Sequence, residues 1–339
     1  MPASQKNLRQ HLAKITVTFK MRSLQLLWIL IFVPASYAQS GGYIDQDAVA
    51  DLLNLRFESL EHIPEVFYRY HVLENDRNNS VLARNVFYRT IGDGNTQLGT
   101  RRSMVVEMIN RRMMQTYTVG DTIIAPTRFE LDFRAYSPFP RYYAGGREFD
   151  KLFIMDKTIQ AFAAYEYGRL MRWGIINTGN PDESPTPYGR YNFNWREEYR
   201  VSSESPEGEP WEMYWVMNFY AGAGMHVHQY EMPTGGPMSH GCVRLVDADA
   251  QWVYNWADIW QTTSTSEGIE SMGAKILKQG TTVLVIGTEP RGKPQPFEHG
   301  RRYPVLKLVD LPAHPYDVPP ATPQQIRFDE LRKSQQIDP

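Results

Sequence analysis

The chain has 339 residues, 42% of them hydrophobic, and its formal net charge is −2. This length is enough for two domains with a sizeable core. A near-neutral charge without a basic block argues against a nucleic-acid partner, so that class of function is excluded first.

The N-terminus has the order of features expected of a secretory signal peptide. Met21-Arg22-Ser23 is followed by an apolar run over residues 24–33 and then by Pro-Ala-Ser-Tyr-Ala, which ends at Ala38. We therefore predict cleavage after Ala38, with translation starting at either Met1 or Met21. The run is too short for a stable bilayer anchor, so export to the periplasm or cell envelope is expected. The alternative is a buried helix at the start of a domain.

Residues 39–150 are predicted to form a smaller N-terminal α+β domain. Residues 45–60 carry an apolar stripe at helical spacing, and 104–110 resemble a short helix. Residues 66–72 and 86–91 alternate as strands do. Residues 117–126 distantly resemble the closing part of a LysM wall-binding repeat, which would imply wall binding. A turn into an edge strand explains the same residues.

Residues 151–288 have the pattern of a mainly β domain. Strands are predicted at residues 151–155, 159–165, 171–177, 191–193, 213–220 and 281–286. The charged stretch 196–210 predicts a loop or lid over a groove. Asp247 is expected to cap a helix whose buried face carries Ala250, Val253, Tyr254 and Ala257. Residues 289–339 are rich in proline and predict an extension laid on the surface, with one or two helical turns at 326–333.

The chemistry is concentrated in residues 225–246. This stretch holds the only cysteine, Cys242, and three of the eight histidines, His226, His228 and His240. A lone cysteine near histidines has the composition of a thiol nucleophile with its general base, because the thiolate is the attacking species. Gly241 lets the backbone approach a substrate, and nearby N–H groups are candidates to hold an oxyanion.

Two other interpretations of these residues remain open. Cys242 is a buried small hydrophobe in the first, since free cysteine packs well in protein cores. In the second, three imidazoles and one thiolate form a zinc site, as in a zinc peptidase.

Residues 239–245 read Ser-His-Gly-Cys-Val-Arg-Leu and resemble the signature of L,D-transpeptidases of the ErfK/YbiS/YcfS/YnhG or YkuD type. That family places a second histidine thirteen residues before the signature serine, where this chain has His226. Thr186-Pro187-Tyr188-Gly189 is similar to the family's Thr-Pro-x-Gly turn. The resemblance implies an α+β fold, with a YkuD-like β-sandwich catalytic domain at residues 151–288.

The resemblance also implies roles for individual residues. Cys242 would be the nucleophile and His226 the proton donor and acceptor, while Ser239, His240, Gly241 and Arg244 would bind substrate or the oxyanion. The chain departs from the family at Val227-His228, where a glycine and a small residue are usual. This departure makes His228 a rival or accessory to the base. An acid at Asp247 or Asp249 is not required, and neither is a metal or organic cofactor.

The implied function is cysteine-dependent peptidoglycan L,D-transpeptidation, an acyl transfer that serves cell wall biogenesis and cell shape. The partners would be peptidoglycan stem peptides, with a wall-attached protein as an alternative acceptor. Neither nucleic acid nor a stable membrane span after signal cleavage is expected. Hydrolysis of the same acyl-enzyme, as in an L,D-carboxypeptidase, is one alternative. A non-catalytic wall-binding protein is another, although an intact Cys242 and His226 argue against it.

Overall fold

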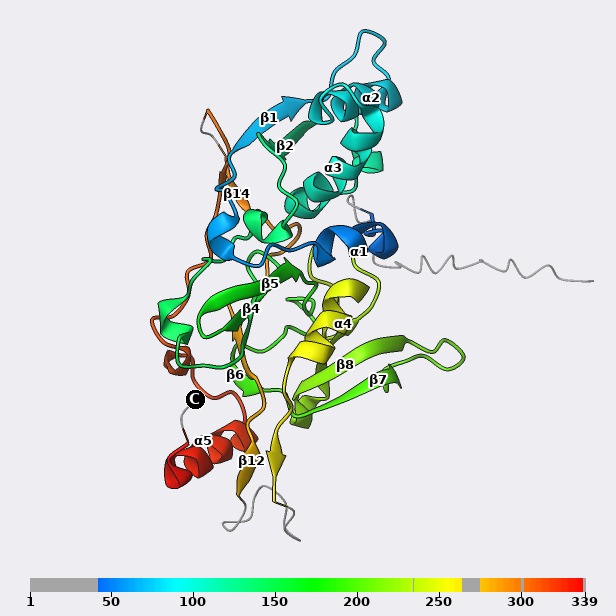
Figure 1. The fold of residues 1–339 in the computed structure, drawn as a ribbon. Helices are drawn as coiled ribbons and strands as arrows, with labels where there is room; N and C mark the ends of the chain where they lie inside the picture. Colours follow the sequence, from blue (N-terminus) through cyan, green and yellow to red (C-terminus); the bar gives the residue numbers. More distant parts are fainter. Residues whose placement is uncertain (1–41, 234, 264–274, 300–301, 338–339) are drawn as a thin grey trace, which may run out of the picture. The chain divides into compact units, whose positions relative to one another are not determined.

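The computed structural model describes residues 42–233, 235–263, 275–299 and 302–337. The predicted signal peptide, residues 1–38, lies outside the described residues. Contacts group Gln39–Pro339 into one compact unit. Its elements are shown in Figure 1.

A five-stranded sheet forms one layer of residues 151–288. Its strand order is β5-β4-β3-β13-β6, and β3 and β13 are its parallel pair. The strands are β3 (Leu152–Asp156), β4 (Ala161–Glu166), β5 (Arg169–Ile175), β6 (Gly189–Asn192) and β13 (Thr282–Ile286). All residues of β3 and β13 are buried, as expected for central strands covered on both faces.

A four-stranded sheet of order β10-β9-β8-β7 forms the second layer. Its strands are β7 (Trp195–Val201), β8 (Glu212–Tyr220), β9 (Met225–Gln229) and β10 (Val243–Leu245). One hydrophobic cluster joins the two sheets and the helix α4 (Asp247–Trp256): it includes Phe153, Phe162, Val283, Phe219, Val227, Val243 and Val253. Burial of these side chains stabilises a sandwich of two sheets. The predicted α+β class with a β-sandwich is confirmed.

The N-terminal region covers the other face of the five-stranded sheet. Its elements are α1 (Gln46–Asn54), β1 (Tyr68–Val72), α2 (Ser80–Ile91), α3 (Thr96–Asn110) and β2 (Thr122–Pro126), with the 3₁₀ helices η1 (Leu60–His62), η2 (Met114–Thr116), η3 (Phe133–Tyr136) and η4 (Ala144–Gly146). A second hydrophobic cluster combines Leu53 and Ile63 of this region with Ile154 and Leu284 of the sheet. The division at residue 150 stays a prediction, but the two parts share this cluster.

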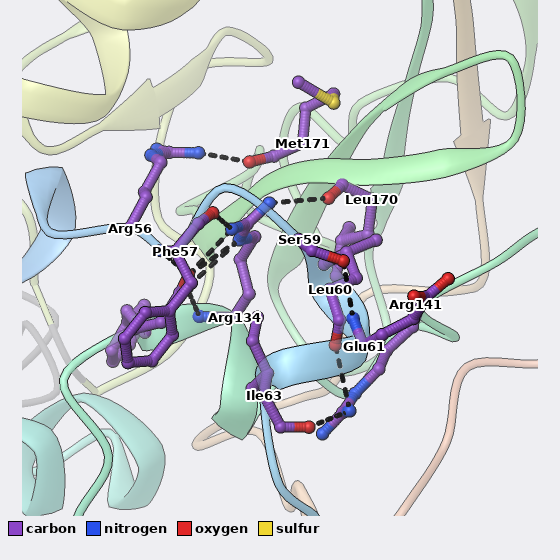
Figure 2. Close-up of polar contacts among 12 residues, drawn as sticks. Arg56, Phe57, Ser59, Leu60, Glu61, Ile63, Arg134, Arg141, Leu170 and Met171 are labelled. Carbon is purple, nitrogen blue, oxygen red and sulfur yellow. Dashed lines mark hydrogen bonds and ion pairs between the residues drawn. The ribbon is translucent and has the colours of Figure 1, made fainter.

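Three arginines tie the segment after α1 to neighbouring backbone (Figure 2). Arg134 donates to the carbonyl oxygens of Phe57 at 2.6 Å and Leu170 at 3.3 Å. The other two donate to the carbonyls of Met171, from Arg56, and of Leu60 and Ile63, from Arg141. Leu170 and Met171 belong to β5, an edge strand, so these contacts cover an edge that would otherwise expose polar backbone.

The C-terminal extension packs on the domain with several short elements. They are β14 (Phe297–Glu298), β15 (Val305–Leu306), the 3₁₀ helix η7 (Pro315–Asp317) and the helix α5 (Pro323–Gln335). The antiparallel pair of β11 (Gln261–Thr262) and β12 (Ile276–Lys278) comes before β13 and belongs to residues 151–288. Helix turns at 326–333 were predicted and are confirmed within α5. Arg190 of β6 forms an ion pair of 2.7 Å with Asp329, which anchors α5 to the sheet.

Three predictions about local structure are wrong. Residues 86–91 belong to the helix α2, because Ala83, Phe87 and Ile91 are buried at a spacing of four. The stretch 196–210 starts as strand β7, which pairs with β8, and only its second half is a loop. Asp247 does not cap α4: the N-cap is Val246, and the Asp247 carboxylate accepts a hydrogen bond of 3.0 Å from Trp215 Nε1.

Candidate active site

Strand pairing brings the two ends of the candidate stretch together. β9 and β10 are parallel neighbours, with Val227 opposite Val243 and His228 opposite Arg244. Cys242 immediately precedes β10, and His226 immediately precedes Val227. Because both strands run in the same direction, this register places the thiol beside the imidazole.

The Cys242 Sγ atom lies 3.7 Å from His226 Nδ1, and this contact defines the candidate site. Cys242 is half-buried, and its Sγ lies 4.0 Å from the carbonyl oxygen of Gly224. His226 is only 6% exposed. A thiol and an imidazole at this distance have the geometry of a nucleophile with its base.

Burial keeps both groups neutral. Desolvation lowers the pKa of His226 to about 4, with a smaller contribution from the positive charge of Arg200. Desolvation also raises the pKa of the Cys242 thiol, against the smaller opposing effects of His226 and Arg244. The resting pair at neutral pH is therefore a thiol and a neutral imidazole, whose free nitrogen lone pair can accept the thiol proton.

An aromatic ring fixes the imidazole from the side. The Trp195 ring, at the start of β7, packs edge-on against His226 with 5.0 Å between ring centroids. His226 Nε2 is buried and has no hydrogen-bond partner among the described residues. The position of His226 therefore depends on packing against Trp195 and on the strand backbone.

Hydrogen bonds within the Cys242 loop, residues 239–242, hold its shape. The Ser239 hydroxyl donates to the carbonyl of Cys242 and accepts from the Gly241 N–H at 3.2 Å. Gly241 has φ of +108°, a region that side-chain-bearing residues rarely adopt. Ser239 and Gly241 thus shape the loop, and the Gly241 N–H is already engaged.

Thr186 of the Thr-Pro-Tyr-Gly turn forms a hydrogen bond with the backbone of the same loop. Its buried hydroxyl donates to the Gly241 carbonyl at 2.9 Å and accepts from the Gly179 N–H at 3.0 Å. Glu289 accepts from the Thr186 N–H and forms a buried ion pair of 3.0 Å with Lys157. The second motif of the sequence therefore contacts the backbone of the first.

The side chains of the remaining predicted site residues each contact a different neighbour. His228 is 4% exposed, its Nδ1 lies 2.8 Å from the Gln229 carbonyl, and burial lowers its pKa to about 3. Arg244 lies over the Tyr230 ring at 4.7 Å. His240 stacks on Trp211 with 5.2 Å between centroids. Among the described residues, no group of three or more His, Cys, Asp or Glu side chains is arranged to hold a metal ion.

Asp249, an acidic residue for which no catalytic role was expected, makes a structural contact. Its fully buried carboxylate forms an ion pair with Arg172 of β5 at 2.5 Å. This pair joins α4 to the five-stranded sheet, which gives Asp249 a structural role.

Sequence reasoning missed Trp195 and Trp211, the aromatic contacts of His226 and His240. Both are tryptophans in or beside a charged stretch, which was the one available signal that this stretch reaches the site. Thr186 was noted as part of a turn, but its contact with Gly241 spans 55 residues of sequence and has no local signature.

Residues 150–285 match the family model YkuD, the L,D-transpeptidase catalytic domain. The resemblance to L,D-transpeptidases predicted from the sequence is thus confirmed for these residues. The match includes the loop with Cys242, the strand with His226 and the turn with Thr186.

Solved structures of L,D-transpeptidases are also similar to parts of this chain. One from Mycobacterium smegmatis has 20% sequence identity and a TM-score of 0.31, over 41% of this chain and 59% of that one. Residues 123–326 of one from Xylanimonas cellulosilytica DSM 15894 have 24% identity and a TM-score of 0.35, over 66% of this chain and 98% of that one. This chain thus spans about three fifths of the length of the Mycobacterium smegmatis protein. A comparison with curated proteins found no match.

No helix within the described ranges is long and apolar enough to cross a membrane.

Proposed function

We propose that this protein is an exported peptidoglycan L,D-transpeptidase that uses Cys242 as its nucleophile. The observation that carries the proposal is the 3.7 Å contact between Cys242 Sγ and His226 Nδ1, inside the residues that match the catalytic-domain family. His226 is the base rather than His228, because the His228 imidazole is turned toward the Gln229 carbonyl.

The first half-reaction forms an acyl-enzyme. His226 takes the proton of Cys242 as the sulfur attacks the carbonyl of the bond between meso-diaminopimelate and the terminal D-Ala of a stem tetrapeptide. The bond from carbon to nitrogen then breaks, and His226 returns the proton to the leaving D-Ala amine. A thioester on Cys242 and free D-Ala result.

The second half-reaction resolves the thioester. An amine of a second stem attacks the carbonyl and gives one proton to His226, which returns it to the sulfur as the C–S bond breaks. The product is a 3→3 cross-link, or a protein attachment when the amine belongs to a wall-attached protein. We assign stabilisation of the oxyanion to the backbone N–H of Cys242, because the Gly241 N–H already donates to Ser239.

Two surface-facing residues are proposed as substrate contacts. The imidazole of exposed His240 is held flat against Trp211, which limits the orientations that it can adopt. Arg244 has a planar guanidinium suited to a stem carboxylate, and its contact with Tyr230 orients that plane.

Mass spectrometry of disaccharide-tetrapeptide incubated with the purified protein tests this function. Wild-type protein should give cross-linked dimers and release D-Ala, and Cys242→Ala should give neither. Release of D-Ala without dimers would replace the proposal with an L,D-carboxypeptidase. Full activity of Cys242→Ala would remove the thiol from the mechanism.

A further inference from the structure

A buried ion pair holds the backbone of Thr186, the residue whose hydroxyl bonds to the Cys242 loop. Glu289 Oε1 accepts a hydrogen bond of 2.9 Å from the Thr186 N–H. Lys157, in the turn between β3 and β4, donates one of 2.6 Å from Nζ to the Thr186 carbonyl. Glu289 Oε2 and Lys157 Nζ lie 3.0 Å apart. One carboxylate and one ammonium thus bind both backbone groups of a single residue.

The pair is enclosed by protein. Lys157 and Glu289 are 5% and 7% exposed, and Thr186 is fully buried. Two charges are costly to bury, so such a pair is a poor way to gain stability alone. It does restrict geometry, because charge-assisted hydrogen bonds are short and strong. The backbone of Thr186 is therefore held in one orientation, with its hydroxyl 2.9 Å from the Gly241 carbonyl.

Glu289 comes from outside the segment that matches the L,D-transpeptidase family. The match covers residues 150–285, and Glu289 is the first residue of the predicted C-terminal extension. The same short segment also meets the loop between β9 and β10. A Cβ atom on Gly236 would stand only 2.5 Å from the Gly292 carbonyl oxygen, so the two backbones are in close contact. Residues 289–292 thus contact both the Thr186 turn and the loop that leads to Cys242.

We propose that Glu289 is a positioning residue of the candidate active site, which acts through Thr186 on the loop that carries Cys242. Lys157 supplies the counter-charge that the buried carboxylate requires. Without the carboxylate, Thr186 loses the acceptor of its N–H, and its hydroxyl no longer holds the Gly241 carbonyl in place. The expected effect on acylation rests on the proposed function, whereas the effect on the loop does not.

Single-turnover acylation by stem tetrapeptide, followed by mass spectrometry of the intact protein, tests this role. Glu289→Ala should lower the maximal rate constant about ten-fold or more, because a small displacement of a nucleophile is costly. The tetrapeptide concentration at half-maximal rate should change less than about two-fold, because no substrate contact is removed. Glu289→Gln keeps an oxygen for the Thr186 N–H and should recover part of the rate. Each rate is corrected for the folded fraction, measured by circular dichroism.

Asp249→Ala is the matched control, because it also removes the carboxylate of a buried ion pair, the one with Arg172 that joins α4 to β5. It should lower the midpoint of urea unfolding and leave the corrected acylation rate unchanged. A wild-type rate in Glu289→Ala, or an equal loss of rate in Asp249→Ala, would overturn the proposal. Acylation of Glu289→Gln no faster than that of Glu289→Ala would also overturn it.

Amide hydrogen exchange tests the same role without any turnover. In Glu289→Ala, peptides covering residues 177–180 and 239–242 should exchange faster than in the wild type, because Thr186 no longer holds both loops. The same peptides of Asp249→Ala should exchange as in the wild type. Faster exchange in Glu289→Ala, together with a wild type that forms no acyl-enzyme, would support the positioning role and refute the proposed function. Unchanged exchange in Glu289→Ala would refute the positioning role whatever the activity.

Discussion

At the scale of single residues, two buried histidines of β9 differ in what their imidazoles face. His226 Nδ1 faces the thiol of Cys242, whereas His228 Nδ1 faces the carbonyl of its neighbour Gln229. The sequence left His228 as a rival for the base. The geometry favours His226 as the base, and variants of the two histidines can test this assignment.

His226→Gln is expected to lower kcat/KM for stem tetrapeptide by about 100-fold or more, the usual contribution of a positioned base. His228→Gln is its matched control, with the same substitution two residues along the strand. It should change stability more than kcat, because His228 is 4% exposed and contacts backbone. A larger loss of kcat in His228→Gln than in His226→Gln would reverse the assignment.

The charge state of Cys242 gives a prediction about pH. Burial raises the thiol pKa above its ordinary value of 9.0, and it lowers the pKa of His226 to about 4. The thiolate fraction at neutral pH is thus smaller than that of a free cysteine. The rate of alkylation by iodoacetamide should therefore keep rising with pH through 9. A rate that reaches its plateau below pH 7 would instead indicate a resting thiolate–imidazolium pair.

At the scale of elements, hydrogen bonds join the turn at Thr186 to the Cys242 loop. The Thr186 hydroxyl bonds to the Gly241 carbonyl and the Gly179 N–H, and the side chain is fully buried. Thr186→Val removes the hydroxyl but keeps the shape, which leaves both backbone groups unsatisfied at a cost of about 1–3 kcal/mol each.

We expect Thr186→Val to lower the midpoint of urea unfolding and to reduce kcat, because the loop that carries Cys242 loses its support. Thr186→Ser keeps the hydroxyl and should retain most of the activity. Equal activity of the two variants would show that the hydroxyl does not position the loop.

The elements also show where sequence reasoning succeeds. β3 and β13 were predicted because continuous apolar runs are required of strands buried on both faces. β7 was missed because most of its residues are exposed, so the strand lacks an apolar pattern and depends on pairing with β8. Cys242 was predicted from a motif of consecutive residues and His226 from its spacing to that motif, and their side chains lie 3.7 Å apart. Trp211 was not predicted, because its stacking on His240 joins distant parts of the chain.

At the scale of the whole molecule, the N-terminal region and the five-stranded sheet share one hydrophobic cluster. Ile63 is 1% exposed and belongs to the same cluster as Ile154 of β3 and Leu284 of β13. Arg134 adds hydrogen bonds between the segment at Phe57 and strand β5. We therefore expect these two parts to unfold as one cooperative unit.

Ile63→Ala should lower the free energy of unfolding by about 2–5 kcal/mol, the usual cost of such a core deletion. Tertiary structure, measured by near-ultraviolet circular dichroism, and enzyme activity should be lost together in one transition. Ile326→Ala is the matched control, because Ile326 is 48% exposed, and should change stability by less than about 0.5 kcal/mol. Two separate transitions would show that the parts unfold independently.

The central claim, that Cys242 forms a thioester with the stem peptide, is tested most directly by mass spectrometry of the intact protein during turnover. After brief incubation with tetrapeptide and an acid quench, the mass should increase by that of the peptide less D-Ala. Peptide mapping should place the adduct on Cys242. Turnover by wild-type protein with the adduct on another residue, or without any adduct and unaffected in Cys242→Ser, would contradict the account.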